Sequence, residues 1–212
     1  MAALTEPELL VLHALRLKSV AATDVVAQVT GLDSTETSER LQAAAGHGWV
    51  RHRDGALAGW SLTPIGRSEA GRWLHDELEA AGVRGAVDEA YRRFLELNPA
   101  LLQVCTDWQL VPAGAATPIR NDHLDVGYDE AVLNRLLAID AEAQPICADL
   151  TGALDRFSSY GPRLHAALER TLAGDGQWLD RPVIDSYHTV WFELHEDLLA
   201  TLGRERSQER SA

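Results

Sequence analysis

The feature that most constrains the fold of this chain is a change in hydrophobic period near Trp49. Before it, apolar residues recur at helical spacing in three short runs. These runs predict a helix over about residues 6–18, a short helix between Thr23 and Gly31, and a third helix over about residues 34–45. After Trp49 the pattern changes to that of a strand.

Capping signals mark the ends of these helices. Thr5 and Glu8 have the spacing of a capping box before the first helix, and Asp33 and Glu36 repeat it before the third. The glycine at position 31 easily adopts the left-handed conformation that ends a helix. We therefore expect helices to begin just after Thr5 and just after Asp33.

A two-stranded hairpin is expected next. Residues 49–53 are typical of a strand, Asp54-Gly55 is a turn signal, and residues 60–62 can return antiparallel. Thr63 then supplies a capping hydroxyl and Pro64 an N-terminal proline for a fourth helix. That helix is expected to carry Ile65, Ala70, Trp73 and Leu74.

The order of helix, helix, helix, hairpin and helix, with Leu62-Thr63-Pro64-Ile65-Gly66-Arg67 after the hairpin, resembles the winged-helix domain of MarR-type regulators. The resemblance covers about residues 5–80. It implies a winged helix-turn-helix whose third helix enters the DNA major groove, and a protein that binds DNA as a homodimer. We place this domain at residues 1–82.

The remaining residues, 83–212, have the pattern of an all-helical domain that follows a hinge at residues 82–85. The predicted elements are a helix over 87–97 ended by Asn98-Pro99, an apolar segment over 101–108, a long loop over 112–127, a kinked or broken helix over 129–157, a shorter helix over 162–172 and a last helix over 182–202. The predicted fold class is therefore mainly α, with one small β-hairpin.

The charge of the chain lowers the expectation of tight DNA binding. The net charge is −13, divided into −4 for residues 1–82 and −9 for residues 83–212. Phosphate neutralisation supplies most of the affinity for nucleic acid, and neither half is basic. Residues 33–72 alone carry five basic and five acidic groups, and salt screens more distant charges over about 8 Å.

Six residues are the candidates for contact with double-stranded DNA. Side chains of the third helix suit base edges, whereas those on the hairpin and the fourth helix suit phosphates. The first group is Thr35, Arg40 and Gln42, and the second is Arg51, Arg53 and Arg67. Glu36 and Glu39 on the third helix do not suit phosphates, so a winged helix that binds a protein partner is the alternative.

Aromatic and histidine side chains are dense in the C-terminal half. The candidates for a small-molecule effector site are Trp108, His123, Tyr187, His188, Trp191 and His195. The last four form a row on the last helix, and we expect Trp108 to meet this aromatic row. The alternative is a set of core histidines hydrogen-bonded to Asp107, Asp185 or the backbone. His188 and His195 are about 10 Å apart along a helix axis, too far to hold one metal ion without other elements.

No sequence motif indicates catalysis. The chain contains no GxSxG, HExxH, P-loop or Rossmann fingerprint, and nothing local activates Cys105 or Cys147. We interpret both cysteines as reduced core thiols and predict no metal site or cofactor. No segment has the composition of a membrane span and residues 1–8 lack the features of a secretory signal, so a cytoplasmic protein is expected.

The favoured function is therefore a cytoplasmic transcription regulator, not an enzyme, whose C-terminal half binds an effector or mediates dimerisation. The alternative is an accessory or scaffold protein that uses its winged helix for protein contact. The run over residues 187–199 resembles segments of chains associated with PEP-utilising enzymes. An enzyme of that class is the partner considered for this alternative.

Overall fold

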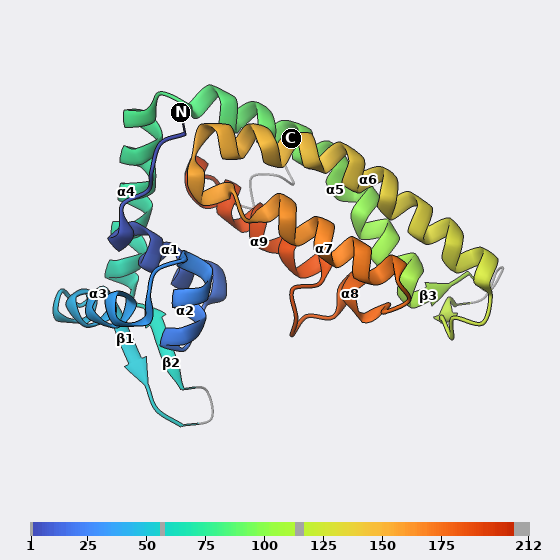
Figure 1. Ribbon diagram of the computed structural model, residues 1–212, viewed down its shortest axis with the longest axis horizontal. Helices are drawn as coiled ribbons and strands as arrows, with labels where there is room; N and C mark the ends of the chain where they lie inside the picture. Colours follow the sequence, from blue (N-terminus) through green and yellow to red (C-terminus); the bar gives the residue numbers. More distant parts are fainter. Residues whose placement is uncertain (1, 56–57, 113–116, 206–212) are drawn as a thin grey trace. The chain divides into compact units, whose positions relative to one another are not determined.

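The computed structural model describes residues 2–55, 58–112 and 117–205. Its contacts divide the chain into two units, which Figure 1 shows coloured along the sequence. The first unit comprises Met1–Arg84, Leu154–Arg156 and Glu196–Ala212, and the second comprises Gly85–Ala153 and Phe157–His195. Two C-terminal segments thus belong to the first unit, which a single division after residue 82 did not anticipate. No helix in the described ranges has both the length and the apolarity needed to cross a membrane.

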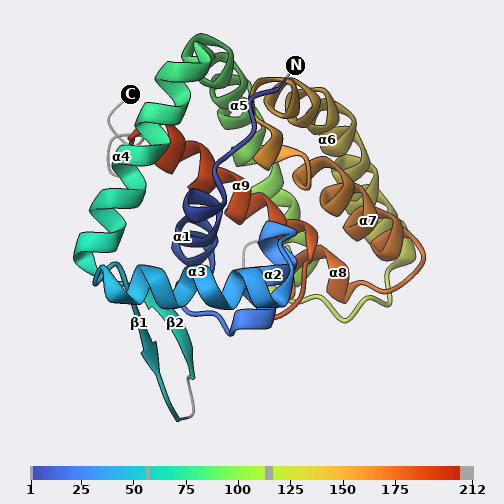
Figure 2. The same cartoon turned by 60° about the vertical axis from the view of Figure 1, so that its left-hand side comes forward.

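The first unit is a winged helix-turn-helix with the predicted order of elements. It contains α1 (Pro7–Lys18), α2 (Thr23–Thr30), α3 (Ser34–Gly46), β1 (Val50–Arg53), β2 (Gly59–Leu62) and α4 (Pro64–Ala81). The two strands pair antiparallel, Val50 with Leu62 and Arg53 with Gly59. In Figure 2 the hairpin extends away from α3 as a wing.

The core of this unit explains why the three helices pack as they do. Leu12 and Leu15 of α1, Val26 of α2, Leu41 of α3 and Val50 of β1 are all buried in one cluster. Each contributes about 1.5–3 kcal/mol of transfer free energy. Leu41 faces this core, and the opposite side of α3 is exposed.

The segment after the wing is held by backbone contacts that require its particular residues. Thr63 caps α4 as predicted, because its hydroxyl accepts from the Gly66 amide at 3.0 Å and also donates to the Gly48 carbonyl at 2.7 Å. A Cβ atom on Gly66 would lie 1.9 Å from the carbonyl oxygen of Trp49. Only glycine therefore allows α4 to approach the start of the wing this closely.

One expectation for the first unit was wrong. Thr5 does not cap α1, whose N-cap is Glu6; its hydroxyl instead donates to the Glu77 carboxylate. Ile65 is 65% exposed, because the buried row of α4 runs through residues 66, 70, 74 and 78. Ile65 lies one position outside that row.

The second unit is helical apart from one short ribbon. Its elements are α5 (Arg84–Gln109), β3 (Leu110–Val111), β4 (Ile119–Arg120), α6 (Val126–Ala153), α7 (Tyr160–Leu172), α8 (Gln177–Asp180) and the start of α9 (Tyr187–Leu202). A 3₁₀ turn (Asp155–Phe157) has its first two residues in the first unit. Helices α6 and α7 pack side by side, as both views show. The short β3–β4 ribbon lies within the segment predicted as an irregular loop.

Helix ends in the second unit also differ from the predictions. Helix α5 continues through Pro99, and α6 continues through Pro145. A proline inside a helix costs about 3 kcal/mol, but Phe94 and Leu101 are buried on the same side of α5, so packing on both sides of Pro99 offsets the cost. Helix α9 begins at Tyr187, five residues later than expected.

Candidate functional sites

The exposed side of α3 carries a polar surface in which the expected base reader is already paired. Thr35 and Gln42 are exposed. Arg40 is half-buried, with its guanidinium 2.6 Å from Glu36 Oε1 and hydrogen-bonded to Glu8 as well. The hydrogen bond with Glu36 raises the pKa of Arg40. Arg40 must leave two carboxylates before it can reach a base.

The wing presents cations in a different setting. Arg51, His52 and Arg53 of β1 are exposed, and Arg51 Nε lies 3.4 Å from Ser61 Oγ across the hairpin. Arg51 and Arg53 form no ion pair with a described carboxylate, and neither does Arg67 at the exposed start of α4. The His52 ring packs edge-on against Trp60, and its Nδ1 atom lies 3.3 Å from Asp54 Oδ1. The unpaired cations of this surface are therefore on the wing and at Arg67.

Three of the six proposed effector residues lie in the core of the second unit. Tyr187, Trp191 and His195 are buried. Trp191 stacks on Phe94 with ring centroids 4.4 Å apart, and His195 packs against the same ring at 5.2 Å. The polar atoms of two of them have partners within the unit: Trp191 Nε1 donates to Asn98 and the Tyr187 hydroxyl donates to Asp140. These contacts are those of core side chains.

His188 and Asp185 do not form the local pair that their spacing suggests. His188 is half-buried. Asp185 instead accepts two hydrogen bonds of 3.0 Å from Arg163, whose guanidinium also donates to Glu193 at 2.7 Å. These contacts raise the pKa of Arg163 against the opposing effect of burial. Arg163 was not singled out in the sequence because its partners are 22 and 30 residues away, in the segment before α9 and in α9 itself.

The other two effector candidates, Trp108 and His123, line a cleft of about 560 Å³ in the second unit. This volume is within the range of small-molecule sites. The walls come from the end of α5, the start of α6 and the turn between α7 and α8; they include Asp129, Leu133, Leu172, Gly176 and Asp180. The Trp108 and His123 rings lie 4.5 Å apart. Tyr187, His188, Trp191 and His195 are not among its lining residues, and the aromatic ring contact of Trp108 is with His123.

A hydrogen-bonded group fixes His123 at the mouth of this cleft. Its Nδ1 lies 2.9 Å from Asp129 Oδ2, while Asp129 Oδ1 accepts from the Asn121 amide at 2.8 Å. The Asn121 side chain also accepts from the His123 backbone amide at 3.0 Å. His123 has a positive φ of 60°, which is rare for a residue with a side chain. The network therefore holds an unusual backbone conformation beside the cleft.

Asp129 was missed as a site residue although the sequence contained a signal. It follows a polar loop and stands in the first turn of α6, a position that favours an acidic side chain for its interaction with the helix dipole. Acidic residues at helix starts are common for this reason. Only the fold shows that Asp129 meets His123.

The cysteines have the environment of core residues. Cys105 and Cys147 are both buried and form no disulfide. Burial raises the pKa of each thiol to about 12. The nucleophilic thiolate is therefore disfavoured at neutral pH. Among the described residues, no group of three or more His, Cys, Asp or Glu side chains is arranged to hold a metal ion.

Comparison with known proteins finds only a partial similarity. No protein-family model matches the chain, and no solved structure matches it. A riboflavin kinase from Halobacterium salinarum is 40% identical over 65 residues. The match covers 26% of this chain and 28% of the kinase, so most of each protein lies outside it.

Proposed function

We propose that this protein is a cytoplasmic transcription regulator of MarR-like design that binds double-stranded DNA as a homodimer. The observation that carries the proposal is the wing of the first unit, where Arg51 and Arg53 are exposed and have no carboxylate partner among the described residues. Unpaired arginines on a projecting hairpin suit DNA phosphates. Arg67, on the exposed start of α4, would extend that contact.

We assign base reading to α3, and we expect α3 to contribute less to the affinity for DNA than the wing does. Thr35 and Gln42 are exposed and offer hydrogen-bonding groups to base edges. Arg40 contributes only if DNA competes with Glu36 and Glu8 for its guanidinium. Affinity in this proposal therefore depends mainly on phosphate contacts and falls steeply with salt.

The sensing part of the proposal rests on the cleft at Trp108 and His123. It combines an aromatic wall, apolar Leu133 and Leu172, and a histidine fixed by Asp129. This mixture of apolar surface and a few fixed polar groups is typical of small-molecule sites. We assign the effector to this cleft rather than to the buried row of Tyr187, Trp191 and His195.

The wing is tested by titrating a mixed-sequence DNA duplex with the full chain and following fluorescence anisotropy at several salt concentrations from about 50 to 200 mM. The R51A/R53A variant is expected to bind all sequences more weakly. Loss of two phosphate contacts should reduce the slope of log K against log salt by about 1.8. The matched control is R92A/R181A, which removes the same charge from exposed positions of the second unit.

Equal salt slopes for the wing variant and the wild type would remove the wing from the mechanism. If the wild type fails to bind DNA even at the lowest salt, the scaffold alternative is favoured. The observation behind that alternative is the acidic surface of α3, where Glu36 and Glu39 adjoin Arg40. The partial match to a riboflavin kinase gives no support for kinase activity, since it spans 28% of that protein.

A further inference from the structure

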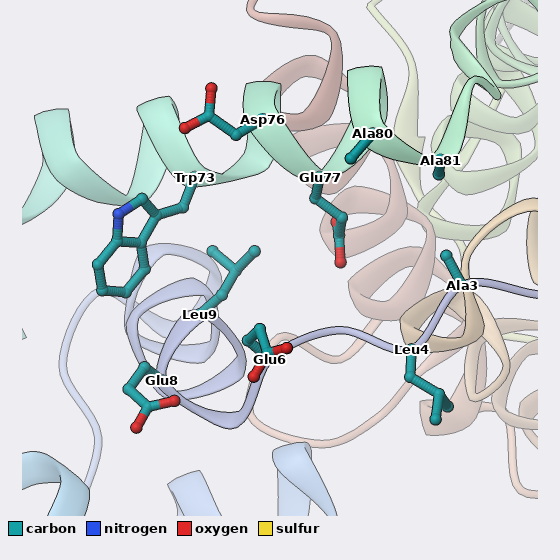
Figure 3. Close-up of a pocket in the computed structure, with 10 residues that line it drawn as sticks. All are labelled: Ala3, Leu4, Glu6, Glu8, Leu9, Trp73, Asp76, Glu77, Ala80 and Ala81. Atoms are coloured by element: carbon teal, nitrogen blue, oxygen red, sulfur yellow. The ribbon is translucent and has the colours of Figure 1, made fainter.

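A second cleft lies in the first unit, between the N-terminal segment, α1 and α4 (Figure 3). Its volume is about 640 Å³. Figure 3 shows Trp73 and Glu77 extending from α4 on either side of the space, with Leu9 of α1 and Glu6, the residue before α1, facing them. Ala3, Leu4, Ala80 and Ala81 close the far end, and Glu8 and Asp76 stand at the rim. Most of this lining is apolar.

Every charged residue that lines this cleft is acidic. The four are Glu6, Glu8, Asp76 and Glu77. The arginines that pair with them are shared with further carboxylates: Arg40 also binds Glu36, Arg72 also binds Glu69, and Arg156 also binds Asp197. Each arginine therefore neutralises its cleft carboxylate only in part. The cleft retains a negative potential.

Glu6 differs from the other three. It is exposed, and no described residue forms a hydrogen bond or ion pair with its carboxylate. Its side chain lies between α1 and α4 in Figure 3, close to the centre of the space. A bound cation could therefore pair with Glu6 without breaking an existing ion pair.

Trp73 supplies an aromatic wall in a fixed orientation. It packs edge-on against Trp49, with ring centroids 5.1 Å apart and an interplanar angle of 85°. The face of a tryptophan ring attracts cations more strongly than any other side-chain ring. Leu9 at the base of the cleft is buried, whereas Leu4 is 81% exposed and leaves apolar surface in contact with water.

We propose that this cleft binds a lipophilic organic cation. The apolar lining suits a ligand with hydrocarbon or aromatic groups, the carboxylates select a positive charge, and the volume is within the range of small-molecule sites. A hydrated metal ion would gain nothing from Leu4, Leu9 and Trp73, and an anion would meet four carboxylates. This inference does not depend on DNA binding.

The test uses two probes with the same shape and opposite charge. Isothermal titration calorimetry of the full chain with tetraphenylphosphonium is expected to give saturable binding, with tetraphenylborate at least about tenfold weaker because of the cleft carboxylates. E6Q should weaken phosphonium binding several-fold, and E6K should weaken it further. A80W, which fills the end of the cleft, should abolish it.

E142Q is the matched control, because it removes one negative charge from an exposed position of α6 in the second unit. It should bind phosphonium like the wild type. Circular dichroism establishes that each variant is folded. Equal binding of the two probes, equal loss in E6Q and E142Q, or unchanged binding in folded A80W would each overturn the proposal.

Discussion

Two histidine–carboxylate pairs, one in each unit, have similar geometry and different surroundings. In the first unit, His13 Nε2 lies 3.0 Å from Asp197 Oδ1, and their side chains are 5% and 2% exposed. In the second, His123 Nδ1 lies 2.9 Å from Asp129 Oδ2, and their side chains are 43% and 15% exposed. Of these two pairs, only the one in the first unit also contacts a buried arginine, Arg156, which binds Asp197 directly.

Burial decides what such a pair does. Buried charges must be fully paired, so His13 of α1, Arg156 of the 3₁₀ turn and Asp197 of α9 hold three distant segments together within the first unit. Glu77 and Thr201 complete the coordination of Arg156. The exposed pair has little to contribute to stability and instead presents an imidazole ring to a cleft.

The largest expected effect is on the buried arginine. R156L should lower the free energy of unfolding by about 3–5 kcal/mol, because it leaves Asp197 and Glu77 buried without their cation. Urea denaturation followed by circular dichroism measures the loss. H123A, which breaks the exposed pair, should cost about 1 kcal/mol or less.

A double variant distinguishes this pairing from a simple loss of packing. R156L/D197L should lose less stability than the sum of the two single variants, since it removes both buried charges. Strictly additive losses, or a similar cost for R156L and H123A, would show that the buried network has no special role.

A smaller effect is expected in the dependence on pH. Burial disfavours the charged form of Asp197, but Arg156 and His13 outweigh it and hold the pKa of Asp197 well below its usual range. A lowered carboxyl pKa stabilises the fold above about pH 4, and this stabilisation disappears as the pH falls through the folded-state pKa. D197N should therefore cost about 2–3 kcal/mol near neutral pH.

The difference between D197N and the wild type should shrink steadily below about pH 4. Stability curves at successive pH values measure it, with D129N as the exposed counterpart. A constant difference down to the lowest pH would contradict the assigned role of the Asp197 charge.

The smallest expected effect concerns the backbone of the exposed pair. His123 has a positive φ, which asparagine tolerates and a β-branched residue does not. H123V should therefore be less stable than H123N by about 1–2 kcal/mol. Both variants lose the imidazole ring, so melting curves of the two isolate the backbone contribution. Equal melting temperatures would mean that the loop relaxes without cost.

The candidate effector site was only partly predictable from the sequence. Trp108 and His123 were identified by residue type, and the structure places both on one cleft. The sequence suggested that Trp108 would meet α9, whereas the ring that packs against it in the structure is that of His123. The β3–β4 ribbon brings His123 near the end of α5 instead, where Asn121 Nδ2 donates to the Trp108 carbonyl. Such contacts between distant segments leave no periodic signal.

Local sequence signals were enough to predict the order of helices and hairpin in the first unit. Asp33 caps α3, Thr63 caps α4, and Gly31 ends α2 with a φ of 73°. All three depend on the conformations available to a few neighbouring residues, and sequence patterns report such local preferences directly.

Tertiary packing, in contrast, sets which polar side chains are buried together and which helices continue through proline. Arg156 lies 41 residues before Asp197 and 79 after Glu77, yet it binds both. Helix α5 passes through Pro99 because side chains packed before and after that position stabilise it. These outcomes depend on packing energies summed over segments that are remote in the chain, and no local pattern contains that sum.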